Sequence, residues 1–487
     1  MVVPRKHTRA AVVRTAAVLA LVVLGAVALV GTSTASDEPS LAPVPRAHCG
    51  PGSLPETDIQ GRVPSRDYTS GRARKGYTCN TRQVSHFGHS GGFKVLRYVD
   101  RAGHTCAFYD STLMFPTDLP YNVGSEGLGV VVLAMDDPAH PVRTTTLSTA
   151  AMDSPHESLL LSKRRGLLVA VAGNAFTAPG VVDVYDVREN CRSPRLMSST
   201  PSGLLGHESG LSLDGKTFYV SSTSGQTLTA IDLADPSVPK VLWTKEGVNY
   251  HGMRVSPDGN RLYVANIGTN MSGTIADGGL QILDVSQIQA RAANPSVRVL
   301  SSLKWRSGSI PQVPEPVTID GHHYLFEVDE FANIKFSNLK LYDADAPVGA
   351  ARIINVDDDT HPFLVSNIRL AVNNQKARHG ASQHDPGASL PVQGYAGHYC
   401  SVPRRVDPKL AACSFIASGL RVFDISHPYH PREVAYFNKP TMPGAKAAHE
   451  GAWAMSAPAW DRRHRQVWYS DGNSGFYAVR LTNGVWR

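Results

Sequence analysis

The amino-acid sequence predicts an all-β protein, a seven-bladed β-propeller of four-stranded antiparallel blades. Three observations predict it: the composition, a hairpin unit that repeats along most of the chain, and a strand at each end of the repeats that lacks a partner. The chain has 487 residues, of which 42 are Gly, 33 are Pro and 42% are hydrophobic. Such a chain can bury a large core, but Gly and Pro interrupt it too often for long helices. Disordered, collagen-like and coiled-coil classes are therefore excluded.

The net charge gives no sign of a polyanionic partner. It is +7 at pH 7, but Arg5, Lys6, Arg9 and Arg14 lie in the first 35 residues, where there is no acidic residue. Without these four charges the chain carries +3. That is little for about 450 residues, so we expect neither nucleic acid nor an anionic membrane as a partner.

The N-terminus has the pattern of a secretory signal peptide over residues 1–35. Residues 4–14 are cationic, residues 15–30 are apolar, and residues 33–35 (STA) offer small side chains for cleavage. An uncleaved anchor is the alternative, but the apolar run is shorter than the about 20 residues of a membrane span. We therefore expect a secreted protein, extracellular or cell-wall associated, with no membrane span after cleavage.

Export would place the six cysteines in an oxidising compartment, where disulfides are expected. Cys400 and Cys413 fall on facing strands of one predicted hairpin, which predicts a disulfide between them. The pairing of the other four stays open, and one arrangement joins Cys49 to Cys79 and Cys106 to Cys191. No CxxC pair is present, which disfavours a cysteine-rich zinc site.

The first segment of the exported chain differs from the rest. Residues 36–78 are rich in Pro, Gly, Ser and charge and show no sustained period. They are predicted to form an extended tail. The propeller domain is assigned to residues 79–487.

One half of the repeating unit is an apolar strand that ends in Asp, a turn that often holds Pro, and a second strand. It occurs six times, at residues 129–147, 181–199, 228–243, 280–305, 351–370 and 420–437. The other half is a strand, a turn commonly built on Asp-Gly, and a strand rich in Tyr and Val. It occurs at residues 92–111, 156–172, 207–222, 251–266, 317–330, 398–415 and 449–470. Asp-Gly tolerates the positive φ of a tight turn, so each half predicts a hairpin and two halves predict a blade.

The two ends of the repeats complete one another. The last blade stops at residues 475–481, one strand short, and residues 80–88 have the form of an outer strand such as residues 431–438. Six complete units and one unit closed by both ends make seven blades, with no long unpaired edge. The absence of helical crossovers excludes parallel-sheet enzymes.

Two of the repeats carry a family resemblance. Residues 251–266 (HGMRVSPDGNRLYVAN) resemble the YVTN type of propeller repeat, and residues 420–431 (LRVFDISHPYHP) resemble the LVIVD repeat. Residues 79–487 as a whole resemble secreted bacterial LVIVD-repeat propeller proteins. The resemblance implies a seven-bladed ring in an exported protein and supplies no catalytic residue. Residues 371–397 depart from the repeat and are expected to form a surface loop.

Five histidines stand at the same place in their blades, the start of the innermost strand: His156, His207, His251, His398 and His449. That strand lines the central channel, so several imidazoles could converge on the axis, where they would suit iron or copper. Glu157, Glu208 and Glu450 follow three of them, and alternation would turn these carboxylates away from the axis to brace a neighbouring histidine. The interpretation that the sequence favours is structural, because YVTN-type repeats commonly carry His before Gly with no metal, and the metal site is the alternative.

A second group of carboxylates, Glu327, Asp329 and Glu330, lies on a strand that is otherwise apolar. Burying an unpaired charge is costly, so we expect a salt bridge to an arginine of the adjacent blade. Calcium, which prefers oxygen ligands, is the alternative.

Two functions from different classes follow. The first is an extracellular binding or scaffold module, monomeric, for a protein, a peptide or a cell-wall component. The alternative is a metal-dependent enzyme, oxidase- or oxygenase-like, with the histidine ring as its metal ligands. Sequence patterns for nucleotide binding and for a serine nucleophile elbow are absent.

Overall fold

The computed structural model describes residues 38–112, 128–173, 180–202, 206–222, 226–268, 278–334, 340, 342–389, 393–445, 447 and 449–486. The chain divides into two compact units, Met1–Thr34 and Ala35–Arg487. The predicted signal peptide lies outside the described residues, and only the second unit is described below. Within the described ranges, no helix has the length and apolar character needed to cross a membrane.

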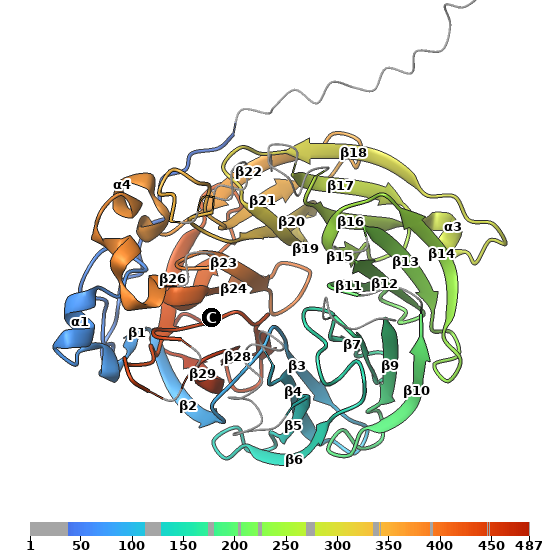
Figure 1. Ribbon diagram of the computed structural model, residues 1–487, viewed down its shortest axis with the longest axis horizontal. Coiled ribbons are helices and arrows are strands. Elements are labelled where there is room, and N and C mark those ends of the chain that lie inside the picture. Colours follow the sequence, from blue (N-terminus) through green and yellow to red (C-terminus); the bar gives the residue numbers. More distant parts are fainter. Residues whose placement is uncertain are drawn as a thin grey trace, which may run out of the picture. The chain divides into compact units, whose positions relative to one another are not determined.

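Seven antiparallel sheets form a ring (Figure 1). Blade 1 contains β3 (Val95–Val99), β4 (Thr105–Asp110), β5 (Val130–Ala134) and β6 (Val142–Leu147). Blade 2 contains β7 (Leu160–Ser162), β8 (Leu167–Val171), β9 (Val181–Asp186) and β10 (Arg195–Pro201). Blade 3 contains β11 (Ser209–Leu211), β12 (Thr217–Ser222), β13 (Thr227–Asp232) and β14 (Lys240–Glu246). Blade 4 contains β15 (Tyr250–Val255), β16 (Arg261–Asn266), β17 (Gly279–Asp284) and β18 (Arg298–Lys304).

The remaining three sheets complete the ring. Blade 5 contains β19 (Ile310–Ile319), β20 (His322–Glu330), β21 (Ala351–Asn355) and β22 (Phe363–Ile368). Blade 6 contains β23 (Gly397–Ser401), β24 (Leu410–Phe415), β25 (Gly419–Asp424), β26 (Arg432–Asn438) and, as a fifth strand, β1 (Tyr77–Cys79). Blade 7 contains β27 (Ala459–Asp461), β28 (Gln466–Asp471), β29 (Gly475–Leu481) and β2 (Thr81–Phe87). In Figure 1 the first strands, such as β11 and β15, lie toward the centre, and β10, β14 and β18 form the outer rim.

Blade 7 is closed by strands from both ends of the repeats, as predicted. β2 pairs antiparallel with β29, with Thr81 opposite Leu481 and Phe87 opposite Phe476. The hydrophobic core confirms that the ring is closed, because each of the seven interfaces between neighbouring blades has its own buried cluster, including the interface between blades 7 and 1. The seven-bladed propeller predicted from the sequence is therefore the observed fold.

The segment predicted as an extended tail packs against blade 6. Its described part, residues 38–78, contains α1 (Ser65–Thr69) and the short 3-10 helix η1 (Ala73–Lys75), and β1 pairs with β26. Glu56 of this segment forms an ion pair with Arg421 of β25, which is fully buried and also pairs with Glu433 at 3.0 Å. The segment thus supplies one of the two charges that neutralise a buried arginine.

The segment predicted as a surface loop, residues 371–397, is partly helical. It contains α4 (Gln375–Arg378) and the 3-10 helices η3 (Ala371–Asn373), η4 (Ala381–His384) and η5 (Pro386–Ala388). Asp385 forms an ion pair with Arg62 at 2.8 Å, and Tyr395 is buried. The segment is therefore built into the fold beside the N-terminal segment. Two further short helices are α3 (Ser286–Gln289) and η6 (Ile416–Ser418).

Three disulfides join all six cysteines: Cys49–Cys79, Cys106–Cys191 and Cys400–Cys413. The predicted Cys400–Cys413 bond is confirmed, and the pairing of the other four, which the sequence left open, is now settled. Disulfides of this kind are compatible with an oxidising, extracellular compartment. Secretion itself stays a prediction.

Candidate metal centre

Four of the five predicted histidines meet in one cluster: His156, His207, His251 and His398. They belong to blades 2, 3, 4 and 6. Glu330 of blade 5 joins them, Phe93 of blade 1 packs against the ring of His156, and the Met455 carbonyl of blade 7 contacts His398. Atoms from all seven blades can meet only where the blades converge, so the cluster lies at the axis of the ring.

The backbone of His156 brings two ligands to the axis instead of one. Its φ of 49° lies in the left-handed region, which is costly for a residue with a side chain and is typical of functional sites. This turn breaks the alternation expected of a strand, so both His156 and Glu157 reach the cluster. Gly173 makes the room, because a Cβ at this position would lie 2.6 Å from the Cβ of His156.

Backbone carbonyls orient two of the imidazoles. Nδ1 of His251 lies 3.1 Å from the Pro311 carbonyl, and Nδ1 of His398 lies 2.7 Å from the Met455 carbonyl. A carbonyl oxygen can only accept, so Nδ1 donates in both residues. Nε2 is the nitrogen left to bind a cation in the cluster.

The facing atoms have the spacing of ligands around a metal ion. Nε2 of His207, His251 and His398 lies 3.3, 3.1 and 3.1 Å from an oxygen of Glu157. Nε2 of His398 and His251 lies 3.4 and 3.6 Å from an oxygen of Glu330, and the Nε2 atoms of His207 and His251 are 2.8 Å apart. Ligands at about 2.1 Å from a metal are separated by about 3.0 Å in octahedral and about 3.4 Å in tetrahedral geometry. The cluster therefore has the dimensions of a coordination site.

Burial shapes the charge balance of the cluster. The side chains of Glu157, His251 and His398 are at most 2% exposed, and that of Glu330 is 8% exposed. Burial opposes protonation of His398, but its contacts with Glu157 and Glu330 outweigh burial and raise its pKa to about 9. Burial and the neighbouring His207 lower the pKa of His156 to about 3. Two buried carboxylates need positive charge nearby, which protons or a metal can supply.

His449 and Glu450 lie apart from the cluster. The His449 ring packs edge-on against Trp453 at 4.2 Å between centroids, and its backbone amide donates to Asn473. Glu450 is exposed. Neither belongs to the groups of described residues that could hold a metal ion.

Glu208 has other partners than the histidines of the cluster. It accepts hydrogen bonds from Lys94 Nζ, at 3.0 and 3.2 Å, and from the Tyr399 hydroxyl. Of the three glutamates expected to brace a histidine, only Glu157 contacts histidines, and it contacts three of them. Glu157 is thus a candidate ligand at the centre of the site.

The three carboxylates of β20, Glu327, Asp329 and Glu330, lie in three different environments. Asp329 forms an ion pair with Arg352 at 2.6 Å, and this arginine belongs to the same blade, not to the adjacent blade as expected. Burial and nearby Asp329 raise the pKa of Glu327 well above its usual value, and Glu327 has no ion pair in the part of the chain that the structure describes. Glu330 joins the axial cluster.

Glu330 and Gln312 are the residues that the histidine pattern missed. Blade 5 has no histidine at the repeat position, and a register shift between Pro311 and Val313 interrupts its inner pairing. Gln312 donates to Glu157, and Glu330, the last residue of β20, brings a carboxylate of blade 5 to the cluster. The sequence offered one signal for them: each is a polar residue in the inner strands of blade 5, whose first strand contains prolines.

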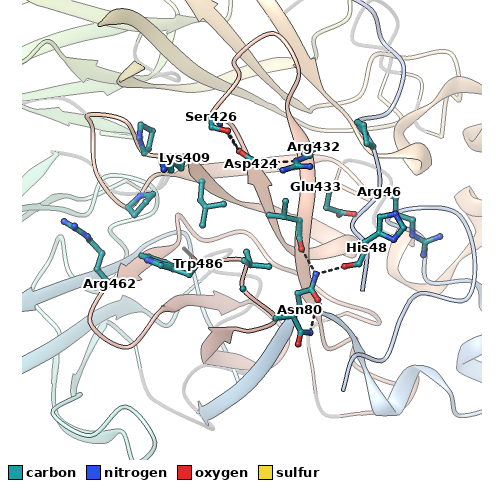
Figure 2. Close-up of a pocket in the computed structure, with 18 of the residues that line it drawn as sticks. Arg46, His48, Asn80, Lys409, Asp424, Ser426, Arg432, Glu433, Arg462 and Trp486 are labelled. Carbon is teal, nitrogen blue, oxygen red and sulfur yellow. Dashed lines mark hydrogen bonds and ion pairs between the residues drawn. The ribbon is translucent and has the colours of Figure 1, made fainter. Parts of the chain in front are cut away.

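A cavity lies elsewhere, between the N-terminal segment and blades 6 and 7 (Figure 2). Its volume is about 670 Å³, and no residue of the axial cluster lines it. Figure 2 shows Arg46, Lys409, Arg432 and Arg462 around it, together with Trp486. Arg432 is paired with Asp424 at 2.9 Å, whereas Lys409 and Arg462 have no ion pair among the described residues.

Solved structures with a similar fold are distant in sequence. The hydrazine synthase of Kuenenia stuttgartiensis matches with a TM-score of 0.50 and 12% identity, over 82% of this chain and 97% of that chain. A periplasmic gluconolactonase of Pseudomonas aeruginosa matches with a TM-score of 0.49 and 14% identity, over 71% and 86%. A protein from Lactobacillus plantarum matches with a TM-score of 0.48 and 14% identity, over 72% and 88%. At such identities the likeness concerns the fold alone.

The sequence comparisons give no family. No family model matches the chain, and no curated protein matches it. The LVIVD and YVTN repeat types stay predictions.

Proposed function

We propose that this protein is a metal-binding β-propeller whose axial cluster holds a first-row transition metal. The ligands are His156, His207, His251, His398, Glu157 and Glu330. One observation carries the proposal. Nε2 of His398 and Oε2 of Glu157 are buried and make no hydrogen bond within the described residues, although oppositely charged atoms lie within 3.4 Å of each. Coordination to a metal would satisfy both atoms.

The ligand set narrows the choice of metal. Imidazole with carboxylate suits iron, manganese, zinc or copper, and every cysteine is held in a disulfide, so thiolate ligation is excluded. Calcium prefers oxygen ligands throughout and fits this set poorly. Iron or copper, expected from the sequence, are both among the candidates.

The site also has a side that is open to water. The His207 side chain is 25% exposed, whereas the other contacts of Glu157 are buried. A metal bound there can keep a position for water, dioxygen or substrate. This arrangement supports the metal-dependent enzyme, oxidase- or oxygenase-like, over a purely structural role of the histidines.

A second candidate is the extracellular binding or scaffold module. The cavity in Figure 2 favours it, because cationic side chains and the aromatic side chain of Trp486 line it. Trp486 packs against Trp460 at 5.1 Å between centroids, which holds the ring in place. A protein, peptide or cell-wall component with acidic groups would fit this cavity, and the two functions can coexist in one chain.

Elemental analysis of protein purified without chelator tests the metal proposal. Glu157→Gln is the test variant, and His449→Ala is the control, because His449 stands at the same repeat position but outside the cluster. We expect stoichiometric metal in the unmodified protein and in His449→Ala, and little in Glu157→Gln. Circular dichroism would show that each variant is folded. Absence of metal in the unmodified protein, together with no uptake of Mn²⁺, Fe²⁺, Co²⁺, Cu²⁺ or Zn²⁺ on titration, would overturn the proposal.

A further inference from the structure

We infer that the axial cluster holds two divalent metal ions bridged by the Glu157 carboxylate. This inference rests on the proposed function and deepens it. The axial cluster would then be a two-metal centre with histidine and carboxylate ligands, in which the two ions differ in their access to solvent.

The two oxygens of Glu157 face different histidines. Oε2 lies 3.1 Å from Nε2 of His251 and 3.3 Å from Nε2 of His207, whereas Oε1 lies 3.1 Å from Nε2 of His398. A carboxylate that binds a single ion faces one set of ligands, whether it uses one oxygen or both. The observed arrangement is that of a bridge between two sets.

Glu330 repeats this division. Its Oε2 lies 3.4 Å from Nε2 of His398, and its Oε1 lies 3.6 Å from Nε2 of His251. Two groups of potential ligands meet the distance limits for one ion each: His156 with Glu157 and His207, and Glu157 with Glu330 and His398. Glu157 is the residue that they share.

Six side chains would fit one octahedral ion or two ions with fewer ligands each, and the two separate ligand groups favour two ions. Six side chains exceed the four that a tetrahedral ion takes. Divided over two ions they give an outer ion bound by His156, His207, His251 and Glu157, and an inner ion bound by Glu157, Glu330 and His398. Ions that share a bridge in two-metal sites lie about 3.5–4 Å apart and activate a water between them.

The two positions differ in burial. Glu157, Glu330 and His398 of the inner position are at most 8% exposed, whereas His207 of the outer position is 25% exposed. The Phe93 ring packs on His156 and His398, one histidine of each set, at 4.5 and 5.4 Å. We therefore expect the outer ion to exchange with solvent and the inner ion to be retained.

Two divalent ions against two carboxylates leave the centre positively charged. Hydroxide can reduce this charge, and so can a ligand that brings its own negative oxygen. Substrates with a phosphate or carboxylate group therefore fit the centre better than neutral molecules.

Titration of metal-free protein with Mn²⁺ tests the inference, with the bound ions counted by elemental analysis and their magnetic coupling measured by electron paramagnetic resonance. We expect two ions per chain with coupled spins in the unmodified protein and in His449→Ala. His398→Ala, which removes a ligand of the inner ion alone, should retain one ion and lose the coupling, and so should His207→Ala through the outer ion.

The outcomes separate the two proposals. One uncoupled ion per saturated chain would overturn the two-metal inference and leave the proposed function intact. No bound ion would overturn both. The count in the unmodified protein decides the matter even if a variant fails to fold.

Discussion

Replacing Lys94 by methionine should destabilise the propeller, because Lys94 is the buried partner of Glu208 on the channel axis. Lys94 Nζ lies 3.0 Å from Glu208, and the two side chains are 1% and 0% exposed. Nζ also lies 3.8 Å from the centroid of the Tyr399 ring, and Arg254 is the next cation, at 3.9 Å from Glu208. Methionine fills a similar volume, so the change removes charge with little loss of packing.

The expected magnitude follows from the burial of this pair. Removal of one partner of a buried ion pair costs about 3–5 kcal/mol, since the other charge stays behind without its counterion. Arg254 remains near Glu208, which places the cost at the lower end, about 3 kcal/mol. Roughly 450 folded residues have an unfolding entropy of about 0.95 kcal/mol/K, so we expect Tm to fall by about 3 °C.

Differential scanning calorimetry at neutral pH measures this shift, with two variants for comparison. Arg101→Met removes a pair of the same kind at the surface, where Arg101 and Glu189 are 65% and 64% exposed, and should leave Tm almost unchanged. Lys94→Met combined with Glu208→Gln should recover most of the loss, because the amide needs no counterion. The reasoning is refuted if Lys94→Met leaves Tm within 1 °C, or if the double variant melts as low as the single one.

Three further predictions concern stability and metal release. Loss of the Cys106–Cys191 disulfide should lower Tm more than loss of the Cys400–Cys413 disulfide, because the loops that they close span 85 and 13 residues. In the chain-entropy model these loops correspond to about 4.6 and about 2.9 kcal/mol of stabilisation. Calorimetry of the paired Cys→Ser variants checks the order. Glu327→Gln should be tolerated, whereas Asp329→Asn should destabilise the protein by about 3–5 kcal/mol because it leaves a buried arginine unpaired. The pKa of Glu327 is raised in the folded protein. Its contribution to stability is therefore full below about pH 4.5 and is lost as pH rises through the raised pKa. We expect Tm of the unmodified protein to fall relative to Tm of Glu327→Gln between pH 5 and pH 9. Acidification should release the bound metal, because protons compete for imidazole and carboxylate ligands, and dialysis at stepwise lower pH with elemental analysis would detect it.

Part of the axial cluster could be predicted from the repeat alone, and part could not. His156, His207, His251 and His398 share a repeat position, and equal positions in successive blades face the same axis. His449 shares that position in the sequence but packs on Trp453 instead. No spacing rule separates it from the other four, since the path of the chain before β27 decides where its ring lies.

The sequence by itself determined the architecture of this protein. Asp-Gly turns, alternating apolar residues and the strand at residues 80–88 are local signals, and each acts on neighbours a few residues away or on one partner strand. They were sufficient for seven blades and for the Cys400–Cys413 bond, because hairpin pairing depends on short sequence separations. Closure of the ring joins distant strands, and it was predictable because residues 80–88 have the form of the one strand that the last blade lacks.

Only the tertiary structure decided the composition of the candidate metal centre. Glu157 reaches the axis because His156 adopts a positive φ beside Gly173, and Glu330 reaches it because blade 5 lacks a histidine and shifts its register. Both facts are departures from the regular repeat inside a single blade, and the three-dimensional path of the backbone decides them. Convergence on an axis is a property of the closed ring, and the repeats carry no local signal for the carboxylates that join the histidines there.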